Sequence, residues 1–148
     1  MGNTLTMTDS IRFAIPDFPA PNDLIINELL SDPQDGAEDF VEIFNRSQKV
    51  IDLRDVRISN YDTVNLVLTS IKTIAPLGYL IFPGEYLALS VDPEGLKLQY
   101  YTSNPKGFVR MESMPSFNID GSTAVISDSL HNIIYLFTIC YFHKLTVN

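Results

Sequence analysis

The sequence predicts an all-β domain, a sandwich or a barrel with little or no helix. Short runs rich in β-branched and aromatic residues alternate with clusters of Pro, Gly, Asn and Asp along most of the chain. No stretch long enough for a typical helix keeps an apolar period of about 3.6 residues without a Pro or Gly interruption. Strands at this spacing, with no helices between them, are typical of sandwiches and barrels.

The N-terminal residues 1–23 are predicted to be a linker or extended segment. They are polar at first and then rich in proline. Proline fixes φ and lacks an N–H donor, so this segment cannot lie in the middle of a sheet, although Ile11–Ile15 could supply an edge strand. The composition changes at Leu24, and we expect one packed domain over residues 24–148.

Nine runs of this domain are expected to form strands. Turn residues separate them: Asp92-Pro93-Glu94-Gly95 fits a type I turn, and Asp120-Gly121 suits a tight hairpin that needs a positive φ. We expect Leu96–Tyr101 to form a short helix or an irregular crossing. The predicted strands are Leu24–Leu30, Phe40–Phe44, Val50–Leu53, Val56–Ser59, Leu66–Thr69, Tyr86–Val91, Phe108–Met111, Thr123–Ser127 and Ile133–Tyr141.

Two of these runs are predicted to be central strands because both of their faces are largely apolar. In Phe40–Phe44, Glu42 shares one face with two phenylalanines, while a valine and an isoleucine share the other. In Leu24–Leu30, strict alternation places Glu28 on the same face as Ile26.

The composition is that of an acidic globular protein. The chain has 148 residues, 45% of them hydrophobic, and a formal net charge of −8, which excludes a disordered chain. This charge makes nucleic acid and anionic membranes unfavourable partners. The basic residues between Arg46 and Arg57 are interrupted by Asp52 and Asp55, so we expect no nucleic-acid binding there. The longest apolar run, Ile133–Phe142, is shorter than the roughly 20 residues of a spanning helix, so we expect no membrane span.

Several segments together resemble the lamin tail domain family, and in particular its bacterial branch. They combine an Asn-Glu strand, an Asp-aromatic-Val-Glu strand, an Asn-basic-Ser turn and an Ile-Asp-Leu segment. These segments are Ile25–Leu29, Asp39–Ser47, Ile51–Leu53 and Val56–Ser59, with weaker matches at Pro83–Leu87, Met114–Phe117, Asp120-Gly121 and Ala124–Ile126. The resemblance runs from about Leu24 to Phe137 and implies an immunoglobulin-like antiparallel β-sandwich.

The resemblance also implies a docking role without catalysis. In nuclear lamins the domain is a surface for chromatin and envelope proteins, and in bacteria it resembles accessory modules of secreted or surface proteins. No catalytic residue is attributed to the family, so none is carried over and we expect no enzyme. Residues 1–15 lack the apolar stretch of a secretory signal. We therefore expect an extracytoplasmic module whose export signal belongs to another part of a longer protein.

An acidic segment after the first predicted strand suggests a metal. Asp32, Asp35, Glu38 and Asp39 lie close together with no basic residue among them, and carboxylate oxygens are the ligands that calcium prefers. The spacing does not fit an EF-hand loop, because glycine stands one place too early. We favour a solvated acidic loop, with an irregular calcium site as the alternative; apart from this calcium we expect no cofactor.

Four polar residues stand among apolar neighbours in the first two predicted strands: Asn27, Glu28, Glu42 and Asn45. The two glutamates could form an acid/base pair of the kind that glycosidases use. The alternative is that all four are buried structural residues, held by backbone amides or by a basic side chain. We favour the structural interpretation because no tryptophan or cluster of sugar-binding aromatic residues accompanies the glutamates.

Aromatic residues between Pro- and Gly-rich turns suggest a contact surface. Tyr100, Tyr101 and Phe108 could form a face for a protein or a glycan, or could instead cap one end of the core. The last predicted strand, Ile133–Tyr141, would leave an adhesive edge if it were unpaired, and it could then drive homodimer formation.

The sequence is therefore compatible with three functions. The first, which we favour, is a non-catalytic binding or spacer module of lamin-tail type with a protein or glycan partner. The second is a carbohydrate-binding sandwich with a calcium-holding acidic loop. The third is a small hydrolase that uses Glu28 and Glu42, which predicts a pocket containing both carboxylates.

Overall fold

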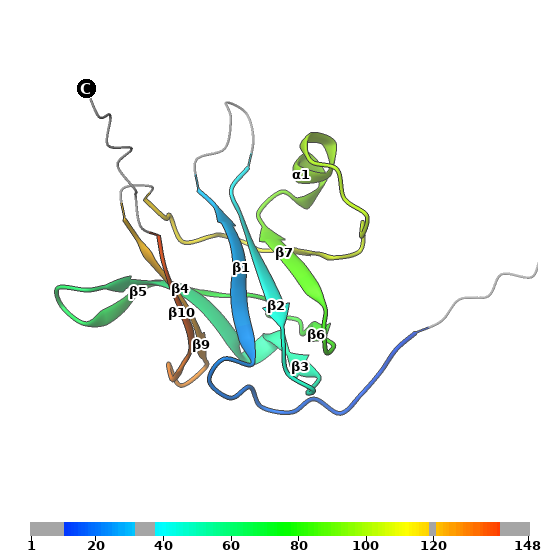
Figure 1. Ribbon diagram of the computed structural model, residues 1–148, viewed down its shortest axis with the longest axis horizontal. Coiled ribbons are helices and arrows are strands. Elements are labelled where there is room, and N and C mark those ends of the chain that lie inside the picture. The colour runs from blue at the N-terminus through cyan, green and yellow to red at the C-terminus, as the bar shows by residue number, and fades with distance from the viewer. Residues whose placement is uncertain (1–10, 32–37, 119–120, 140–148) are drawn as a thin grey trace, which may run out of the picture.

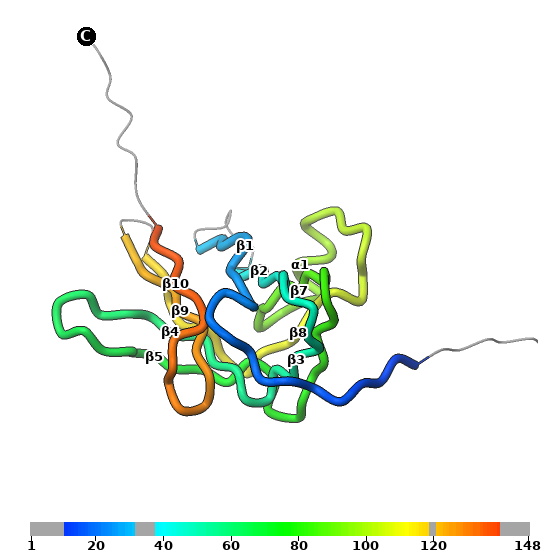
Figure 2. The backbone as a smooth tube through the Cα atoms, turned by 60° about the horizontal axis from the view of Figure 1, so that its bottom comes forward, coloured from blue at the N-terminus to red at the C-terminus, as the bar shows by residue number. Residues whose placement is uncertain are grey.

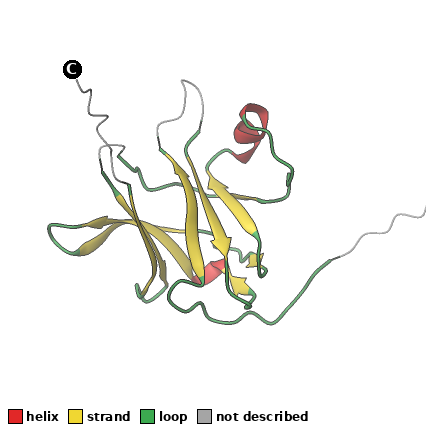
Figure 3. Cartoon of the chain, in the orientation of Figure 1, coloured by secondary structure: helices red, strands yellow, loops and turns green. Residues whose placement is uncertain are grey.

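The computed structural model describes residues 11–31, 38–118 and 121–139. Within these ranges the chain forms ten strands, one 3₁₀ turn and one short α-helix (Figures 1 and 3). No helix of this part of the chain is long and apolar enough to cross a membrane. The elements are β1 (Leu24–Leu30), β2 (Phe40–Asn45), β3 (Ile51–Asp52), η1 (Leu53–Asp55), β4 (Val56–Asp62), β5 (Val67–Thr73), β6 (Leu80–Ile81), β7 (Tyr86–Ser90), α1 (Pro93–Gln99), β8 (Phe108–Arg110), β9 (Thr123–Asp128) and β10 (Ile133–Thr138).

Two four-stranded sheets form the body of the domain. One has the order β1-β2-β7-β8 and the other the order β10-β9-β4-β5, while β3 and β6 form a small two-stranded sheet. Figure 2 shows the two larger sheets as separate layers. This arrangement confirms the predicted immunoglobulin-like β-sandwich. One pair, β7 with β8, is parallel, because α1 and the segment after it carry the chain across before β8 begins.

The core lies between the inner faces of the two sheets. In β2 every second residue is buried, as the period of two along a strand requires, whereas five consecutive residues of β9 are buried. Most of the buried core residues are Leu, Ile or Val. The fully buried large side chains include Leu24, Ile43, Ile51, Leu53, Ile58, Ile74, Ile81, Leu89 and Ile126.

A β-bulge in β1 changes which residues face the core. The register with β2 shifts between Ile26 and Glu28, so Asn27 is the extra residue. Ile26 faces the core and Glu28 faces solvent, so the prediction that they share a face was wrong. The run Leu24–Leu30 also proves to be an edge strand rather than a central one, whereas β2 is central as predicted.

The helix α1 replaces the turn that we predicted at its start. Pro93 stands in the first turn of the helix, where its missing N–H carries no penalty and its fixed φ favours helix formation. Pro93 and Leu96 are the residues that α1 buries. A short helix was one of the two expectations for Leu96–Tyr101, but the structure places it earlier. The strand β6 was not predicted because only two residues form it. The predicted Asp120-Gly121 hairpin lies partly outside the described residues.

Aspartates organise the two hairpins of the second sheet. At the end of β4, Asp62 accepts hydrogen bonds from the backbone N–H groups of Val64 and Asn65, and from the Asn65 side chain. The hydrogen bonds from Asn65 and Val64 lower the pKa of Asp62. At the end of β9, Asp128 accepts three equivalent bonds within its own turn, one from the backbone N–H of Leu130 and two from Asn132. In both turns, backbone N–H groups and an asparagine side chain thus donate to an aspartate carboxylate.

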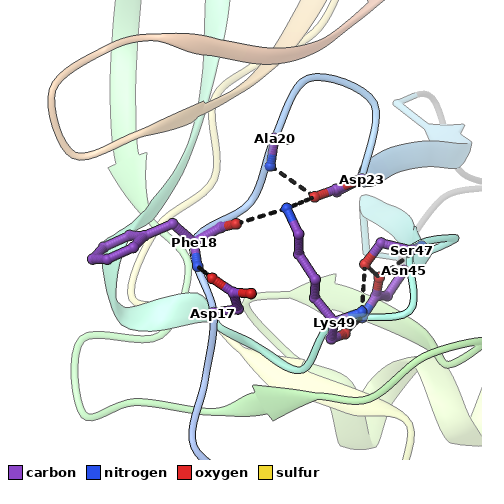
Figure 4. A network of polar contacts seen from close by, with 7 residues as sticks. All are labelled: Asp17, Phe18, Ala20, Asp23, Asn45, Ser47 and Lys49. Atoms are coloured by element: carbon purple, nitrogen blue, oxygen red, sulfur yellow. Dashed lines mark hydrogen bonds and ion pairs between the residues drawn. The ribbon is translucent and has the colours of Figure 1, made fainter.

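The segment before β1 is attached to the domain by a polar network (Figure 4). Lys49 Nζ lies 2.8 Å from an Asp23 carboxylate oxygen and 3.1 Å from the Phe18 carbonyl oxygen. The backbone N–H of Asp17 donates to the Val50 carbonyl. Burial alone would raise the pKa of Asp23, but its hydrogen bonds with Lys49 and the Ala20 N–H and the positive charges of Lys49 and Arg46 together lower it.

The buried amide of Asn45 holds the end of β2 in place. Its Nδ2 donates to the carbonyl oxygens of Lys49 at 2.8 Å and Ile81 at 3.1 Å. Its Oδ1 accepts from the backbone N–H and the hydroxyl of Ser47 (Figure 4). The side chain is completely buried, and its hydrogen bonds join the turn after β2 to β6. Asn45 is therefore a structural residue.

Candidate binding groove

The outer face of the β1-β2-β7-β8 sheet carries a row of side chains that crosses all four strands. Glu28 is the register partner of Glu42, Glu42 of Ala88, and Ala88 of Phe108. Val41, Ile43, Leu87 and Leu89 occupy the opposite, buried face of the central strands. The row therefore faces away from the core, and the small Ala88 side chain leaves a hollow between Glu42 and Phe108.

Aromatic side chains line both sides of this row. Phe44 and Tyr86, which are register partners, stack with ring centroids 4.3 Å apart. On the other side, Phe40 contacts Tyr100 edge to face at 6.1 Å. Such pairs fix ring positions because the electron-rich face of one ring attracts the edge or offset face of another.

The helix α1 and the segment that follows it build one wall of the hollow. Leu96 is buried against the domain, and Tyr100, Tyr101 and Thr102 follow. Figure 1 shows α1 beyond the end of β7, beside the sheet that carries the row. Together these residues enclose a groove of about 260 Å³, which we call the acidic-aromatic groove. Its lining residues are Glu28, Phe40, Glu42, Ala88, Leu96, Tyr100, Tyr101, Thr102 and Phe108.

A second, wider hollow continues the groove along the sheet. It has a volume of about 600 Å³ and shares Glu42, Ala88, Thr102 and Phe108 with the first. Asn27 and Glu85 extend its polar lining. The two hollows therefore adjoin along the outer face of the sheet and share four lining residues.

The groove holds negative charge that no described basic side chain neutralises. Glu42 accepts a hydrogen bond from Asn27 Nδ2 at 2.6 Å, and Glu28 is exposed. Among the described residues, neither glutamate forms an ion pair with a lysine or arginine. Like charges on directly opposite cross-strand positions destabilise a sheet. The repulsion between Glu28 and Glu42 therefore lowers the stability of the isolated domain.

The structure brings together two groups of residues that the sequence analysis considered separately. Tyr100, Tyr101 and Phe108 were predicted as a contact surface, and Glu28 and Glu42 as buried structural groups. All five line the acidic-aromatic groove. The hydrolase hypothesis predicted one pocket that contains the carboxylates of both Glu28 and Glu42, and the groove has this arrangement.

The expectation that Asn27 and Glu28 are buried was wrong. Both are exposed, and Glu42 is half-buried. The bulge at Asn27 is the physical reason, because it turns this part of β1 out of the alternating pattern and presents both side chains on the outer face.

Phe40 and Ala88 are groove residues that the sequence analysis did not single out as such. The signal for Ala88 was a small side chain on the face of the predicted strand Tyr86–Val91 that also carries Tyr86. Recognising it requires the register of three strands, which the sequence does not provide.

The predicted calcium ligands are only partly described. Asp32 and Asp35 lie outside the described residues, while Glu38 and Asp39 are half-buried at the start of β2. Within the described ranges, no three His, Cys, Asp or Glu side chains are grouped so that they could hold a metal ion. The calcium site stays a prediction.

Three of the four basic residues between Arg46 and Arg57 are engaged in structural contacts. Lys49 pairs with Asp23, Arg54 Nη2 lies 3.8 Å from an Asp52 oxygen, and Arg57 donates to two backbone carbonyls. Arg46, the remaining basic residue, is exposed, and the expectation of no nucleic-acid binding here stays a prediction.

The last strand pairs within the domain along one edge. β10 is hydrogen-bonded to β9, and the Asn22 N–H donates to the Ile134 carbonyl at 2.7 Å on this strand. The strand was predicted to extend to Tyr141, and residues 140 and 141 of this prediction lie outside the described residues. Homodimer formation through this edge stays a prediction.

The fold and the register define an immunoglobulin-like β-sandwich module with a groove on the outer face of one sheet. A family model for the lamin tail domain matches residues 18–134. The chain therefore belongs to the lamin tail domain family, as its first strands and turns predicted. No curated protein matches the chain closely enough to count as a relative.

Proposed function

We propose that this lamin tail domain is a non-catalytic binding module that docks a protein partner on the acidic-aromatic groove. The observation that carries the proposal is the joint presence, in one groove, of partly exposed aromatic rings and unneutralised carboxylates on a rigid sheet. Tyr100 is 42% and Tyr101 is 97% exposed. Exposed aromatic side chains of this kind contribute much of the contact energy in protein interfaces.

The placement of the two glutamates supports binding over hydrolysis. In glycosidases the two carboxyl groups flank the scissile bond. Glu28 and Glu42 instead stand side by side on neighbouring strands of one sheet, so both approach a bound ligand from the same side. We propose that they recognise charge and that they catalyse no reaction.

We further propose that the module occupies residues 24–148, that residues 1–23 link it to a neighbour, and that the whole belongs to a bacterial secreted or surface protein. The support is the resemblance of Asp39–Ser47 and its neighbouring segments to the bacterial branch of the family. Sequencing the surrounding gene tests this context, because a longer chain with an export signal is expected.

A carbohydrate partner is the second candidate. The exposed ring of Tyr101 and the partly exposed ring of Phe108 could stack on sugars, and Asn27 with the two glutamates could bond to hydroxyl groups. A glycan array separates the two candidates, because a reproducible glycan signal lost on Tyr101→Ala substitution would favour the sugar.

The docking proposal is tested by selecting peptides against the domain from a random phage-displayed library. The positions of the selected peptides are then mapped by amide chemical-shift perturbation. We expect the shifts to centre on Glu42, Ala88 and Phe108. Ala88→Trp should fill the hollow and abolish binding, whereas Thr69→Trp, on an exposed position of β5, should leave it unchanged. Peptides that bind equally well to both variants would refute the proposal.

A further inference from the structure

We propose that the acidic-aromatic groove recognises an arginine guanidinium group of the partner protein. The inference rests on the proposed docking function and specifies the chemistry of the partner. The groove carries two adjacent carboxylates, since Glu28 and Glu42 are cross-strand partners. The formal net charge of the whole chain is −8. A groove of this kind is electrostatically complementary to a cationic side chain.

Two basic residues of the elements that build the groove, Lys97 of α1 and Arg110 of β8, pair with carboxylates other than Glu28 and Glu42. Lys97 Nζ pairs with Glu94 at 2.8 Å and lies 5.0 Å from the centre of the Phe108 ring. Arg110 donates to the Val91 carbonyl and contacts Asp92 at 3.3 Å. Within the part of the chain that the structure describes, neither Glu28 nor Glu42 forms an ion pair, so both can accept hydrogen bonds from a cation of a partner.

The chain itself contains an arginine that contacts both a carboxylate and an aromatic ring, and this carboxylate lines the wider hollow. Arg12 pairs with Glu85 and places its guanidinium carbon 4.2 Å from the centre of the Phe82 ring. Glu85 also lines the wider hollow. An arginine of the chain itself thus contacts one carboxylate and one aromatic ring. The groove offers two carboxylates and several rings.

The groove residues favour a guanidinium over a metal ion. Calcium takes six to eight oxygen ligands, whereas the acidic-aromatic groove contributes two carboxylates, and within the described residues no three His, Cys, Asp or Glu side chains are grouped so that they could hold a metal ion. Aromatic walls are also poor ligands for a hard cation. A guanidinium is planar and weakly hydrated, it stacks on aromatic rings, and it presents several N–H donors to neighbouring carboxylates.

The size of the groove fits a side chain better than a whole small-molecule ligand. Its volume of about 260 Å³ lies just below the usual range of sites for drug-sized molecules. Thr102 and Ala88 leave the groove open toward the wider hollow, which could hold the backbone of the partner on either side of the arginine.

The test uses the peptide acetyl-Gly-Arg-Gly-amide as probe, with the citrulline peptide as its neutral isostere and the lysine peptide as a second cation. Each is titrated into the full chain at low ionic strength and followed by amide chemical shifts. We expect saturable shifts centred on Glu28, Glu42, Ala88 and Phe108, with a Kd in the millimolar range. The citrulline peptide should bind at least about tenfold more weakly, and the lysine peptide should lie between the two.

Matched variants connect the binding to the two glutamates. Glu28→Gln should weaken binding of the arginine peptide about fivefold, and the double substitution with Glu42→Gln should remove it. Glu112→Gln removes an equal charge from an exposed position outside the groove, and it should change the Kd less than twofold. Equal weakening by Glu28→Gln and Glu112→Gln would show only general attraction to an acidic protein and would overturn the inference.

The remaining outcomes separate this inference from the docking proposal. If the phage-selected peptides occupy the groove but tolerate replacement of every arginine by citrulline, docking stands and the guanidinium inference is wrong. If the arginine peptide shifts only residues of the other sheet, the inference is also wrong. If no selected peptide occupies the groove, both proposals fail.

Discussion

Replacing Glu28 by glutamine is expected to make the domain more stable while it weakens binding. Glu28 and Glu42 are opposite each other in an antiparallel pair, where Cβ atoms stand about 5 Å apart. At that separation two unit charges in water repel by about 0.8 kcal/mol without salt. With Debye lengths of about 10 Å and 3 Å, the repulsion falls to about 0.5 kcal/mol at 0.1 M salt and about 0.15 kcal/mol at 1 M salt.

The expected gain is therefore about 0.5 kcal/mol at 0.1 M salt, which corresponds to a rise in Tm of about 2 °C for a domain of this size. Differential scanning calorimetry at several salt concentrations measures it. Glu112→Gln is the control for the general effect of removing one charge from an acidic chain. The reasoning is refuted if Glu28→Gln lowers Tm, or if its gain equals that of the control at every salt concentration.

Three further predictions concern the network that holds β2, the attachment of the N-terminal segment and the groove. Asn45→Ala leaves buried carbonyl groups without donors and should cost about 3 kcal/mol, or about 9 °C in Tm; Asn118→Ala, at an exposed position, should change Tm by less than 1 °C. Because the folded-state pKa of Asp23 lies below its ordinary value of 3.8, its contribution to stability is present above that pH and is lost as the pH falls through the folded-state pKa. Asp23→Asn should flatten the plot of Tm against pH in this acidic range. An unchanged plot would show that the pairing of Asp23 with Lys49 does not contribute to stability. The Ala88→Arg variant should have a higher Tm than the Ala88→Met variant, since only the arginine carries a charge opposite to that of Glu42. A higher Tm for the methionine variant would argue against an uncompensated carboxylate at Glu42.

Much of the fold could be predicted because local patterns and tertiary contacts agree along most strands. β1 has the predicted limits, and β2 differs only by the inclusion of Asn45. Alternation also assigned Glu42 to the face that carries Phe40 and Phe44, and the register confirms this. These strands follow from side-chain periodicity, which any sheet with one buried face must obey.

The bulge could not be predicted in the same way. Asn27 breaks the alternation by one residue, and an asparagine between isoleucine and glutamate is equally compatible with a regular strand. The consequence is large because a slip of one position moves every later side chain to the other face. This is why Glu28 was expected to share a face with Ile26.

The groove depends on contacts between residues that are far apart in the sequence. Phe40 and Tyr100 meet only because β7 pairs with β2 and α1 follows β7. The aromatic surface near Tyr100 could be proposed from composition. That this surface lies in the same groove as Glu28 and Glu42 could be seen only once the strand order was known. Sequence periodicity says which face a side chain occupies, whereas strand order decides which faces adjoin.

The most direct test is a crystal structure of the domain with the tightest phage-selected peptide. The account predicts an extended peptide on the outer face of the β1-β2-β7-β8 sheet, with an arginine seated between Glu42 and Phe108. A peptide bound along β5, or on the outer face of the β4-β9 sheet with the groove unoccupied, would contradict it.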